Sequence, residues 1–148
     1  MTKNATPTSA LAMFRDREAS VAAYQAALGK RIVCVAMIIA EAQDDEEGRS
    51  ALRIEFTGGT RLTLSDAGQN CCERRYMSTD DDLSMFVGAT FTGIAIRDIT
   101  RADDESDDCY EHETQFMIVT TSWGSFTCCS HNEHNGYYGG IYISASAE

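Results

Sequence analysis

The sequence predicts an α+β fold, in which one N-terminal helix precedes a mostly antiparallel sheet of six to seven strands. Three observations support this: an apolar pattern of helical period near the N-terminus, later segments in which apolar and polar residues alternate, and glycine-containing turns between them. A chain of 148 residues is long enough for one hydrophobic core. We therefore expect a single domain over 1–148, with a helical segment at 1–30 and a β-rich body at 31–148.

The helix is predicted over residues 9–28, because Gly29 is a natural stop signal and the apolar positions repeat as on one helix face. Those positions are Leu11, Phe14, Val21, Tyr24 and Leu28. The next segment, 31–40, is apolar and rich in β-branched residues, so we expect a well-buried strand there.

A hairpin is expected next, since residues 51–56 and 60–65 both alternate and "TGG" separates them. "CCERRY" at 71–76 is predicted to be a loop, and "DDDLSMFVG" a short helix capped by Thr79 or Asp80. Further strands are predicted over 90–99, 114–121, 125–130 and 141–146, with a turn at "SWG" and a loop at "HNEHNGYYGG" before the last strand.

The second half of the chain repeats the order of the first. Superposing Gly59 on Gly124 puts the segment 71–76 opposite the end of the segment 131–138. We infer a degenerate duplication of a three-strand unit, which gives two pseudo-repeated β-meanders with a short helix between them. Such a repeat would bring the two unusual segments to the same end of the fold.

The charge and cysteine pattern narrow the classes of function. Twelve basic and 23 acidic residues give a formal net charge of −11, which disfavours binding to a nucleic-acid backbone and fits a basic host protein as partner or a mimic of nucleic-acid charge. No apolar run reaches the roughly 18 residues of a membrane span, and the N-terminus does not resemble a secretion signal. Because four of the six cysteines form adjacent pairs, we expect reduced thiols in a cytoplasmic protein.

The segment "HNEHNGYYGG" at 131–140 is the strongest candidate for a functional site, and its first interpretation is a metal centre. His131, His134 and Cys72 could bind zinc or another divalent metal in a metal-dependent enzyme. The spacing lacks the paired ligands of structural zinc sites, and adjacent cysteines in a strand point to opposite faces, so no cofactor is expected. Other residues of ligating type are Cys71, Cys129, His112 and Glu133. A catalytic Cys–His pair would rest on co-occurrence alone.

The second interpretation is a ligand cradle. The glycines let backbone N–H groups approach a ligand, Tyr137 and Tyr138 offer rings for stacking, and Asn132 and Asn135 can donate and accept hydrogen bonds. Across the presumed cleft, Arg74 and Arg75 could hold a phosphate or a carboxylate.

The third interpretation is an ordinary turn, since Asn-Gly and Gly-Gly are common turn residues. In that case Tyr138 and the closing strand could form an edge that pairs with a second copy, which leaves a homo-oligomer open. Two smaller features receive plain interpretations as well. "STDDDL" lacks the spacing of a calcium loop and more simply begins a helix, and His112 is expected to have a structural role on its strand.

Three motifs carry a family resemblance: "CCERRYMSTDDDLSMFVGA", "HETQF" and "SHNEHNGYYGG". They resemble an uncharacterised family of small proteins from bacteriophages and some bacteria, which carries a domain-of-unknown-function label. The resemblance covers about residues 54–143 and leaves out the helical N-terminus and the acidic inserts. It implies a site, without an activity, at the residues that match the family's blocks: Cys72, Glu73, Arg75, Tyr76, Asp80, Asp81, Asp82, His131, Asn132, His134, Asn135, Tyr137 and Tyr138.

The leading functional prediction is a phage-type accessory protein, non-enzymatic, that binds a small anionic or nucleotide-like ligand in a polar-aromatic pocket. The phage context implied by the resemblance adds a role in counteracting host defence, by sequestering a nucleotide signal or blocking a defence protein. Two alternatives stay open: a metal-dependent enzyme that uses His131 and His134, and an acidic protein-interaction module.

Overall fold

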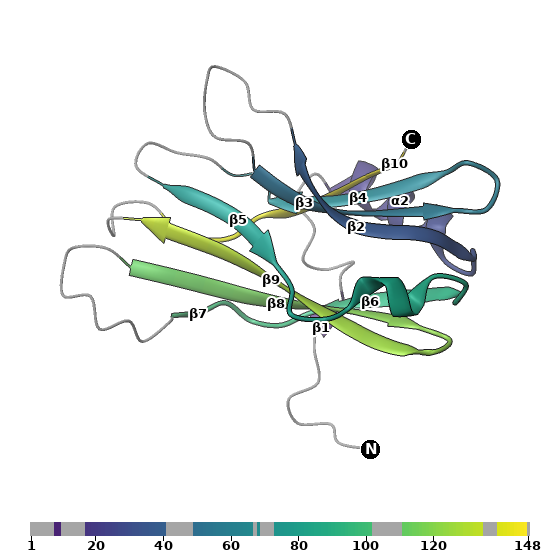
Figure 1. Cartoon of the computed structure of the whole chain (residues 1–148). Helices are drawn as coiled ribbons and strands as arrows, with labels where there is room; N and C mark the ends of the chain where they lie inside the picture. The colour runs from purple at the N-terminus through teal and green to yellow at the C-terminus, as the bar shows by residue number, and fades with distance from the viewer. Residues whose placement is uncertain are drawn as a thin grey trace.

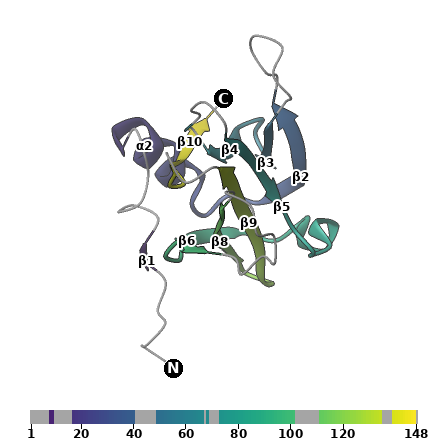
Figure 2. The ribbon, with the colours of Figure 1, turned by 90° about the vertical axis from the view of Figure 1, so that its left-hand side faces the viewer.

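The computed structural model describes residues 8–9, 17–40, 49–66, 68, 73–101, 111–134 and 139–147. Within them, two antiparallel sheets face each other and one α-helix lies along their side (Figures 1 and 2). The elements are β1 (Thr8–Ser9), α2 (Arg17–Ala27), β2 (Ile32–Ala40), β3 (Arg49–Phe56), β4 (Arg61–Asp66), β5 (Arg74–Ser78), the 3-10 helix η1 (Leu83–Phe86), β6 (Phe91–Ile96), β7 (Thr100–Arg101), β8 (Glu111–Thr121), β9 (Gly124–His134) and β10 (Ile143–Ala147).

The topology is two three-strand meanders that exchange a fourth strand. One sheet has the order β10-β4-β3-β2, and the other has the order β1-β6-β8-β9-β5 with β7 paired to β8. The first half of the chain therefore supplies β5 to the second sheet, where it pairs with β9. The second half returns β10 to the first sheet, where it pairs with β4.

The core lies between the two sheets, because each strand turns alternate side chains inward. β4 shows this plainly, since every second residue from Leu62 to Asp66 is buried. Fully buried aromatic and aliphatic side chains from both sheets form one cluster, among them Phe56, Phe91 and Phe126. The packing of two inner faces over one core is that of a β-sandwich.

Helix α2 ties the two sheets together at one side of the sandwich. The Tyr24 hydroxyl accepts a hydrogen bond from Ile94 N of β6 at 3.1 Å, and Ser20 Oγ accepts one from Ala145 N of β10 at 3.0 Å. The outer edge of β10 is therefore occupied at Ala145, which works against the predicted pairing of this strand with a second copy.

Ser9, where the helix was predicted to start, lies with Thr8 in a strand that pairs with β6. The described helix spans Arg17–Ala27, and the predicted helical residues 10–16 lie outside the described part. The predicted end is confirmed, because the helix closes at Ala27 and Gly29 adopts a left-handed backbone with φ of 83°.

The strand after the helix, β2, is not well buried, which corrects the prediction. It is the last strand of its sheet, and Val33 and Ile39 are 45% and 71% exposed. An apolar run without clear alternation cannot show whether a strand is central or at an edge.

The two segments predicted as loops are strands over most of their described length. Residues 74–76 of "CCERRY" belong to β5, and residues 131–134 of "HNEHNGYYGG" belong to β9. Polar residues can continue a strand when the neighbouring strand completes the ladder, and here each segment is the partner of the other.

The short helix is confirmed as a 3-10 turn, but its cap is Asp82 rather than Thr79 or Asp80. Asp82 Oδ1 accepts from Ser84 N at 3.1 Å. The count of six to seven strands in one sheet is also too low. The described residues include eight strands of five or more residues, divided between two sheets. The antiparallel pairing is as predicted, and the duplication stays a prediction.

The helix contact yields a test of how the sandwich closes. Tyr24→Phe keeps the ring against Phe91 but removes the acceptor of Ile94 N–H, so we expect a loss of about 1–3 kcal/mol in the free energy of unfolding. Urea denaturation measures it. Val33→Ala on the exposed face of β2 is the control and should stay within about 0.5 kcal/mol. Equal effects of the two changes would contradict the bridging role of Tyr24.

Candidate functional site

The two motif segments meet as neighbouring antiparallel strands. Arg74, Arg75 and Tyr76 of β5 stand opposite Glu133, Asn132 and His131 of β9, in that order. Residues 71 and 72 and residues 135–138, which complete the motifs, lie outside the described residues. Residues 74–76 of "CCERRY" and residues 131–133 of "HNEHNGYYGG" thus pair one to one.

Strand alternation divides both motifs between two faces of the sheet. Arg75, Asn132 and His134 point inward and are buried. Arg74, Tyr76, His131 and Glu133 point to the outer face, where they are half-buried or exposed. The single cradle predicted from the sequence is therefore two separate clusters, one on each side of the sheet.

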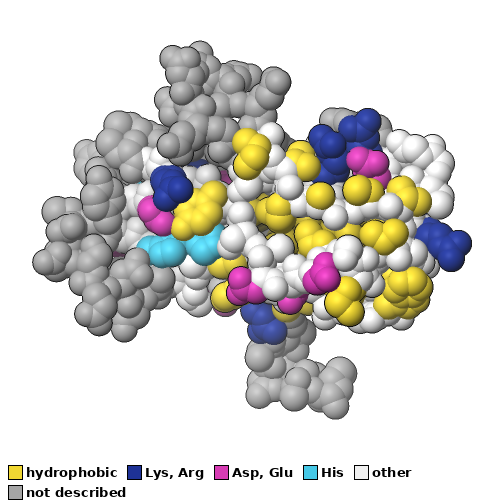
Figure 3. Space-filling model, in the orientation of Figure 1, with side chains coloured by type: hydrophobic (Ala, Val, Ile, Leu, Met, Phe, Trp, Pro, Cys, Tyr) yellow, Lys and Arg dark blue, Asp and Glu magenta, His cyan; other side chains and the backbone are white. Residues whose placement is uncertain are grey.

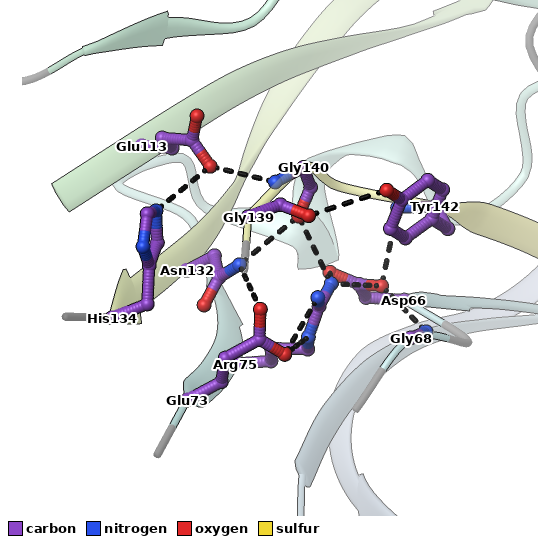
Figure 4. Close-up of polar contacts among 10 residues, drawn as sticks. All are labelled: Asp66, Gly68, Glu73, Arg75, Glu113, Asn132, His134, Gly139, Gly140 and Tyr142. Carbon is purple, nitrogen blue, oxygen red and sulfur yellow. Dashed lines mark hydrogen bonds and ion pairs between the residues drawn. The ribbon is translucent and has the colours of Figure 1, made fainter. Parts of the chain in front are cut away.

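The inward cluster is centred on Arg75, whose side chain is fully buried. Its Nη1 donates to both carboxylate oxygens of Asp66 at 2.9 and 2.8 Å. Its Nε and Nη2 donate to Glu73 Oε1 at 2.9 and 2.8 Å. Nη1 also reaches Gly140 O at 3.1 Å, and the guanidinium lies 5.5 Å from the centre of the Tyr142 ring. All three nitrogens of the guanidinium group thus donate hydrogen bonds to other groups of the protein (Figure 4).

The same cluster holds the chain segment that leads to β10. Asn132 Nδ2 donates to Gly140 O at 3.0 Å and to Glu73 Oε2 at 3.2 Å. Gly140 N donates to Glu113 Oε1 at 2.8 Å, and the same oxygen lies 3.1 Å from His134 Nε2 (Figure 4). We call this set the crossover clamp: Asp66, Glu73, Arg75, Glu113, Asn132, His134, Gly140 and Tyr142.

The two glycines of the motif suit this close packing. A Cβ on Gly139 would stand 3.2 Å from Glu113 Oε1 and 3.3 Å from the His134 ring, so these side chains would have to shift to make room for it. Gly140 has φ of 93°, a conformation that L side chains rarely adopt. "GG" therefore serves the clamp, and nothing in these contacts requires a ligand.

Electrostatics make the clamp costly to disturb. Burial raises the pKa of Asp66 above its ordinary value, although Arg75 and the backbone donors Gly68 and Tyr142 act in the opposite direction. Removing Arg75 would leave the carboxylates of Asp66 and Glu73 buried without their cation. Arg75, Glu73 and Asn132 are thus already engaged, and their place in the predicted anion cradle is not supported by these contacts.

The outer cluster is a row of stacked groups. The Arg74 guanidinium lies 4.9 Å from the centre of the Tyr76 ring, and Tyr76 stacks on His131 at 4.3 Å with an interplanar angle of 6°. His131 in turn stacks on His112 of β8 at 5.1 Å and 29°. The space-filling view shows histidine side chains on this face beside basic, acidic and hydrophobic ones (Figure 3). We call this set the outer ladder: Arg74, Tyr76, Ser78, His112, His131 and Glu133.

Hydrogen bonds connect the members of the outer ladder. Ser78 Oγ lies 2.8 Å from His131 Nε2, and His131 Nδ1 lies 2.9 Å from His112 Nε2. Tyr76 donates its hydroxyl to Glu133 Oε2 at 2.7 Å, and Arg74 Nη1 is 3.7 Å from Glu133 Oε1. Unlike the clamp, this cluster reaches solvent, since the Arg74 side chain is 65% exposed.

The titration properties of the ladder follow from partial burial. Burial and the hydrogen bond to Glu133 raise the pKa of Tyr76 to about 12, so the phenol keeps its proton at neutral pH. Burial also lowers the pKa of His131, and the neighbouring His112 lowers it further, while Glu133 acts in the opposite direction. His131 is therefore a neutral imidazole at pH 7.

The acidic run lies at the other end of β5 and has local roles. Asp82 caps η1, and Asp81 Oδ2 accepts from Thr127 N at 2.8 Å. Asp80 is exposed. Among the other predicted ligand-binding and metal residues, Cys72, Asn135, Tyr137 and Tyr138 lie outside the described residues.

A metal centre that uses both His131 and His134 does not fit the strand. His131 contacts His112 on the outer face, whereas His134 contacts Glu113 on the inner face. The prediction assumed a loop that curls back, and a continuous strand separates the two imidazoles instead. In the part of the chain that the structure describes, no group of three or more His, Cys, Asp or Glu residues is placed to hold a metal ion.

Several site residues were missed from the sequence. Asp66 could have been found, because it continues the inward positions of Leu62 and Leu64, and an inward carboxylate needs a buried partner. Glu113 and Tyr142 had no comparable signal. Ser78 belongs to the ladder only through the register of β5 on β9, and His112 was expected to be structural.

Comparison with known protein families assigns the chain to a family. The model of a family described as a domain of unknown function (DUF7448) matches residues 25–143, which is more than half of the chain. The protein belongs to this family. The match begins earlier than the resemblance predicted and extends across both acidic inserts, which are residues 44–47 and 103–108. No curated protein and no solved structure matches the chain.

Two further predictions have partial outcomes. Cys34, Cys128 and Cys129 are free thiols, and Cys128 and Cys129 point to opposite faces as expected. No helix in the described ranges is both long enough and apolar enough to cross a membrane.

Neighbouring arginines provide a matched test of the clamp. Arg75→Met removes the cation that pairs with two buried carboxylates, so we expect a loss of about 3–5 kcal/mol in the free energy of unfolding by urea denaturation. Arg74→Met removes a loose, exposed ion pair and should cost no more than about 1 kcal/mol. Similar small losses in both variants would show that Arg75 does not hold the fold.

The lowered pKa of His131 predicts a pH dependence of stability. Below the ordinary value of 6.5 the unfolded chain binds a proton that the folded protein still excludes from His131, so the free energy of unfolding should fall with decreasing pH. Above that value this contribution is constant. His131→Asn should show a smaller fall between about pH 7 and about pH 5 in thermal unfolding. Parallel curves for the two proteins would refute this assignment.

Proposed function

We propose that the protein is a binding protein whose outer ladder holds a small anionic or nucleotide-like ligand. The observation that carries this proposal is the stack of Arg74, Tyr76, His131 and His112 on a solvent-exposed sheet face. The residues of the clamp on the inner face have a structural role, because they hold the two sheets together. Stability does not account for the residues of the ladder in the same way, because replacing exposed polar residues on a sheet surface costs little stability.

Arg74 is the main contact in the proposed complex. Its guanidinium is planar, exposed and held over the Tyr76 ring, which gives a surface for stacking an aromatic base. Its ion pair with Glu133 is loose at 3.7 Å, compared with 2.8 Å for Arg75 and Asp66. A phosphate or carboxylate can therefore compete for Arg74 at small cost.

The charge of the chain limits the size of the ligand. Glu133 stands beside Arg74, Asp80 is exposed beyond the end of the same strand, and the net charge is −11. A polyanion would meet repulsion over most of the surface. A mononucleotide or another ligand with few charges needs only the local cation.

The biological setting is part of the same proposal. A small protein that sequesters a nucleotide signal would suit the phage-type accessory role and the counteraction of host defence that the sequence resemblance implied. The basic host protein considered as a partner from the net charge would be an alternative target of the acidic surface.

The proposal is tested by thermal shift with nucleoside monophosphates and cyclic nucleotides, with inorganic phosphate and an uncharged nucleoside as separate arms. Nucleotides should stabilise the protein most, by about 2.7 kcal/mol when their concentration is a hundredfold above Kd. Phosphate alone or nucleoside alone should stabilise it less, because each uses only half of the surface.

Variants locate the binding surface. Arg74→Met and Tyr76→Leu should abolish the shift, whereas Arg53→Met, which removes a similarly loose surface ion pair on the other sheet, should retain it. A shift that survives Arg74→Met would exclude the ladder as the site. No stabilisation by any nucleotide at millimolar concentration would overturn the proposal.

A further inference from the structure

The geometry points to a second capability of the outer ladder: we propose that Ser78 is an activated nucleophile for acyl transfer from carboxylic esters. In this assignment His131 is the general base and His112 positions it. The inference does not rest on ligand binding at Arg74, because it uses the hydroxyl and imidazole contacts at the other end of the ladder.

The first argument is the arrangement of the three groups. Ser78 Oγ is 2.8 Å from Nε2 of His131, and His131 Nδ1 is 2.9 Å from Nε2 of His112. A nucleophile within hydrogen-bond reach of a base, with a third group on the other nitrogen of that base, is the pattern of serine hydrolases. The nitrogens are used in the same way, with Nε2 toward the serine and Nδ1 toward the third group.

The second argument is access. Ser78 is exposed on β5, and His131 and His112 are half-buried, so a substrate can reach the hydroxyl while the base is partly shielded from water. The third histidine, His134, is instead buried in the clamp, where its Nε2 lies 3.1 Å from Glu113 Oε1.

The third argument concerns the acyl group. Ser78 stands opposite Cys129 of β9, which stands opposite Phe116 of β8, and all three point to the outer face. Phe116 is 43% exposed. An apolar acyl chain bound to Ser78 could therefore lie across Cys129 and Phe116, whereas an anionic chain would approach the exposed Asp80. The expected substrates are uncharged esters with a short apolar acyl group.

The proposed reaction needs only Ser78, the two histidines and water. Ser78 Oγ attacks the carbonyl carbon while its proton passes to His131 Nε2, and His131 Nδ1–H donates to His112. The tetrahedral adduct collapses, the C–O bond to the leaving alcohol breaks, and the alcohol takes the proton from Nε2. Water then releases the acid from acyl-Ser78 with the same base. Only the nucleophile and the base are assigned, so the test substrates should be activated esters, whose alcohol leaves readily.

The electrostatic surroundings favour the base. Among the residues that the structure describes, the titratable or charged groups that face or adjoin His131 are Tyr76 and Arg74 of β5, His112 of β8, and Cys129 and Glu133 of β9. Tyr76 keeps its proton and burial raises the pKa of Cys129, so these two remain uncharged at pH 7. Glu133 then stabilises the imidazolium that forms when Ser78 gives up its proton.

The test uses a fluorophosphonate probe, which transfers its phosphonyl group to an activated serine with loss of fluoride. Peptide mapping of the intact chain after labelling should place the adduct on Ser78, and release of p-nitrophenol from p-nitrophenyl butyrate should follow the same variants. Ser78→Ala should remove both signals. Ser125→Ala, which changes an exposed serine six residues before His131 on β9, should change neither.

The histidine variants test the two remaining roles. His131→Gln should lower the labelling rate by about 100-fold or more. His112→Gln should lower it less and should shift the pH midpoint of labelling upward, since His112 helps to keep the pKa of His131 low. A purely structural His112 would leave that midpoint unchanged. Unchanged thermal unfolding of each variant serves as the folding control.

Three outcomes would overturn the proposal. One is the absence of an adduct on Ser78 in the folded protein. Another is labelling of Ser78 no faster than of Ser125. The last is a labelling rate that does not depend on His131.

Discussion

The buried charge of Arg75 is the constraint on which the rest of the structure depends. After the passage from β1 through α2 to β2, the chain crosses between the two sheets twice more, from β4 to β5 and from β9 to β10, and both of these crossings pass this guanidinium. Asp66 precedes the first crossing, Glu73 ends it, and Gly140 lies in the second. One cation therefore fixes both points at which the halves of the chain exchange strands. A buried ion pair is weak evidence of net stabilisation, but removing one of its partners is strongly destabilising. Such a pair is suited to specifying one arrangement of the chain.

The clamp also explains how a single motif can serve two purposes. Successive residues of a strand point to opposite faces, so Arg75 and Asn132 enter the clamp while their neighbours Arg74, Tyr76 and His131 reach solvent. The inner contacts fix the register of β5 on β9, and that register sets which outer side chains face each other. The outer ladder is thus positioned by contacts that it does not itself make, as a preorganised site on rigid strands requires.

The sequence predicted elements better than their assembly. The hairpin, the later strands and the 3-10 turn follow from local patterns, because alternation and turn residues act over a few positions. The division into two sheets does not follow from local patterns. It depends on the pairing of β5 with residues more than forty positions away and on the pairing of β10 with residues more than seventy positions away. "CCERRY" and "HNEH" were predicted as loops for the same reason. Their polar residues give no strand signal until the partner strand is known.

The candidate site shows the same limit. The motif residues were correctly singled out as unusual, but a list of residues does not say which of them share a face. His131 and His134 looked like a pair because they are three apart, and a strand places such residues on opposite sides. His112 is the actual neighbour of His131, from a strand whose register no local pattern reveals.

The hydrogen-bond inventory of the outer ladder bears on what the proposed ligand must supply. Tyr76 O–H and Arg74 are both donors, and Glu133 is the acceptor they share. An uncharged ligand that displaced Glu133 would leave two donors poorly satisfied, which works against binding. An anion with two oxygens in one plane, such as a phosphate or a carboxylate, replaces both contacts at once. In the proposed complex Glu133 would therefore favour an anionic ligand rather than oppose it, because it holds the two donors in the orientation that a second acceptor of the same shape requires.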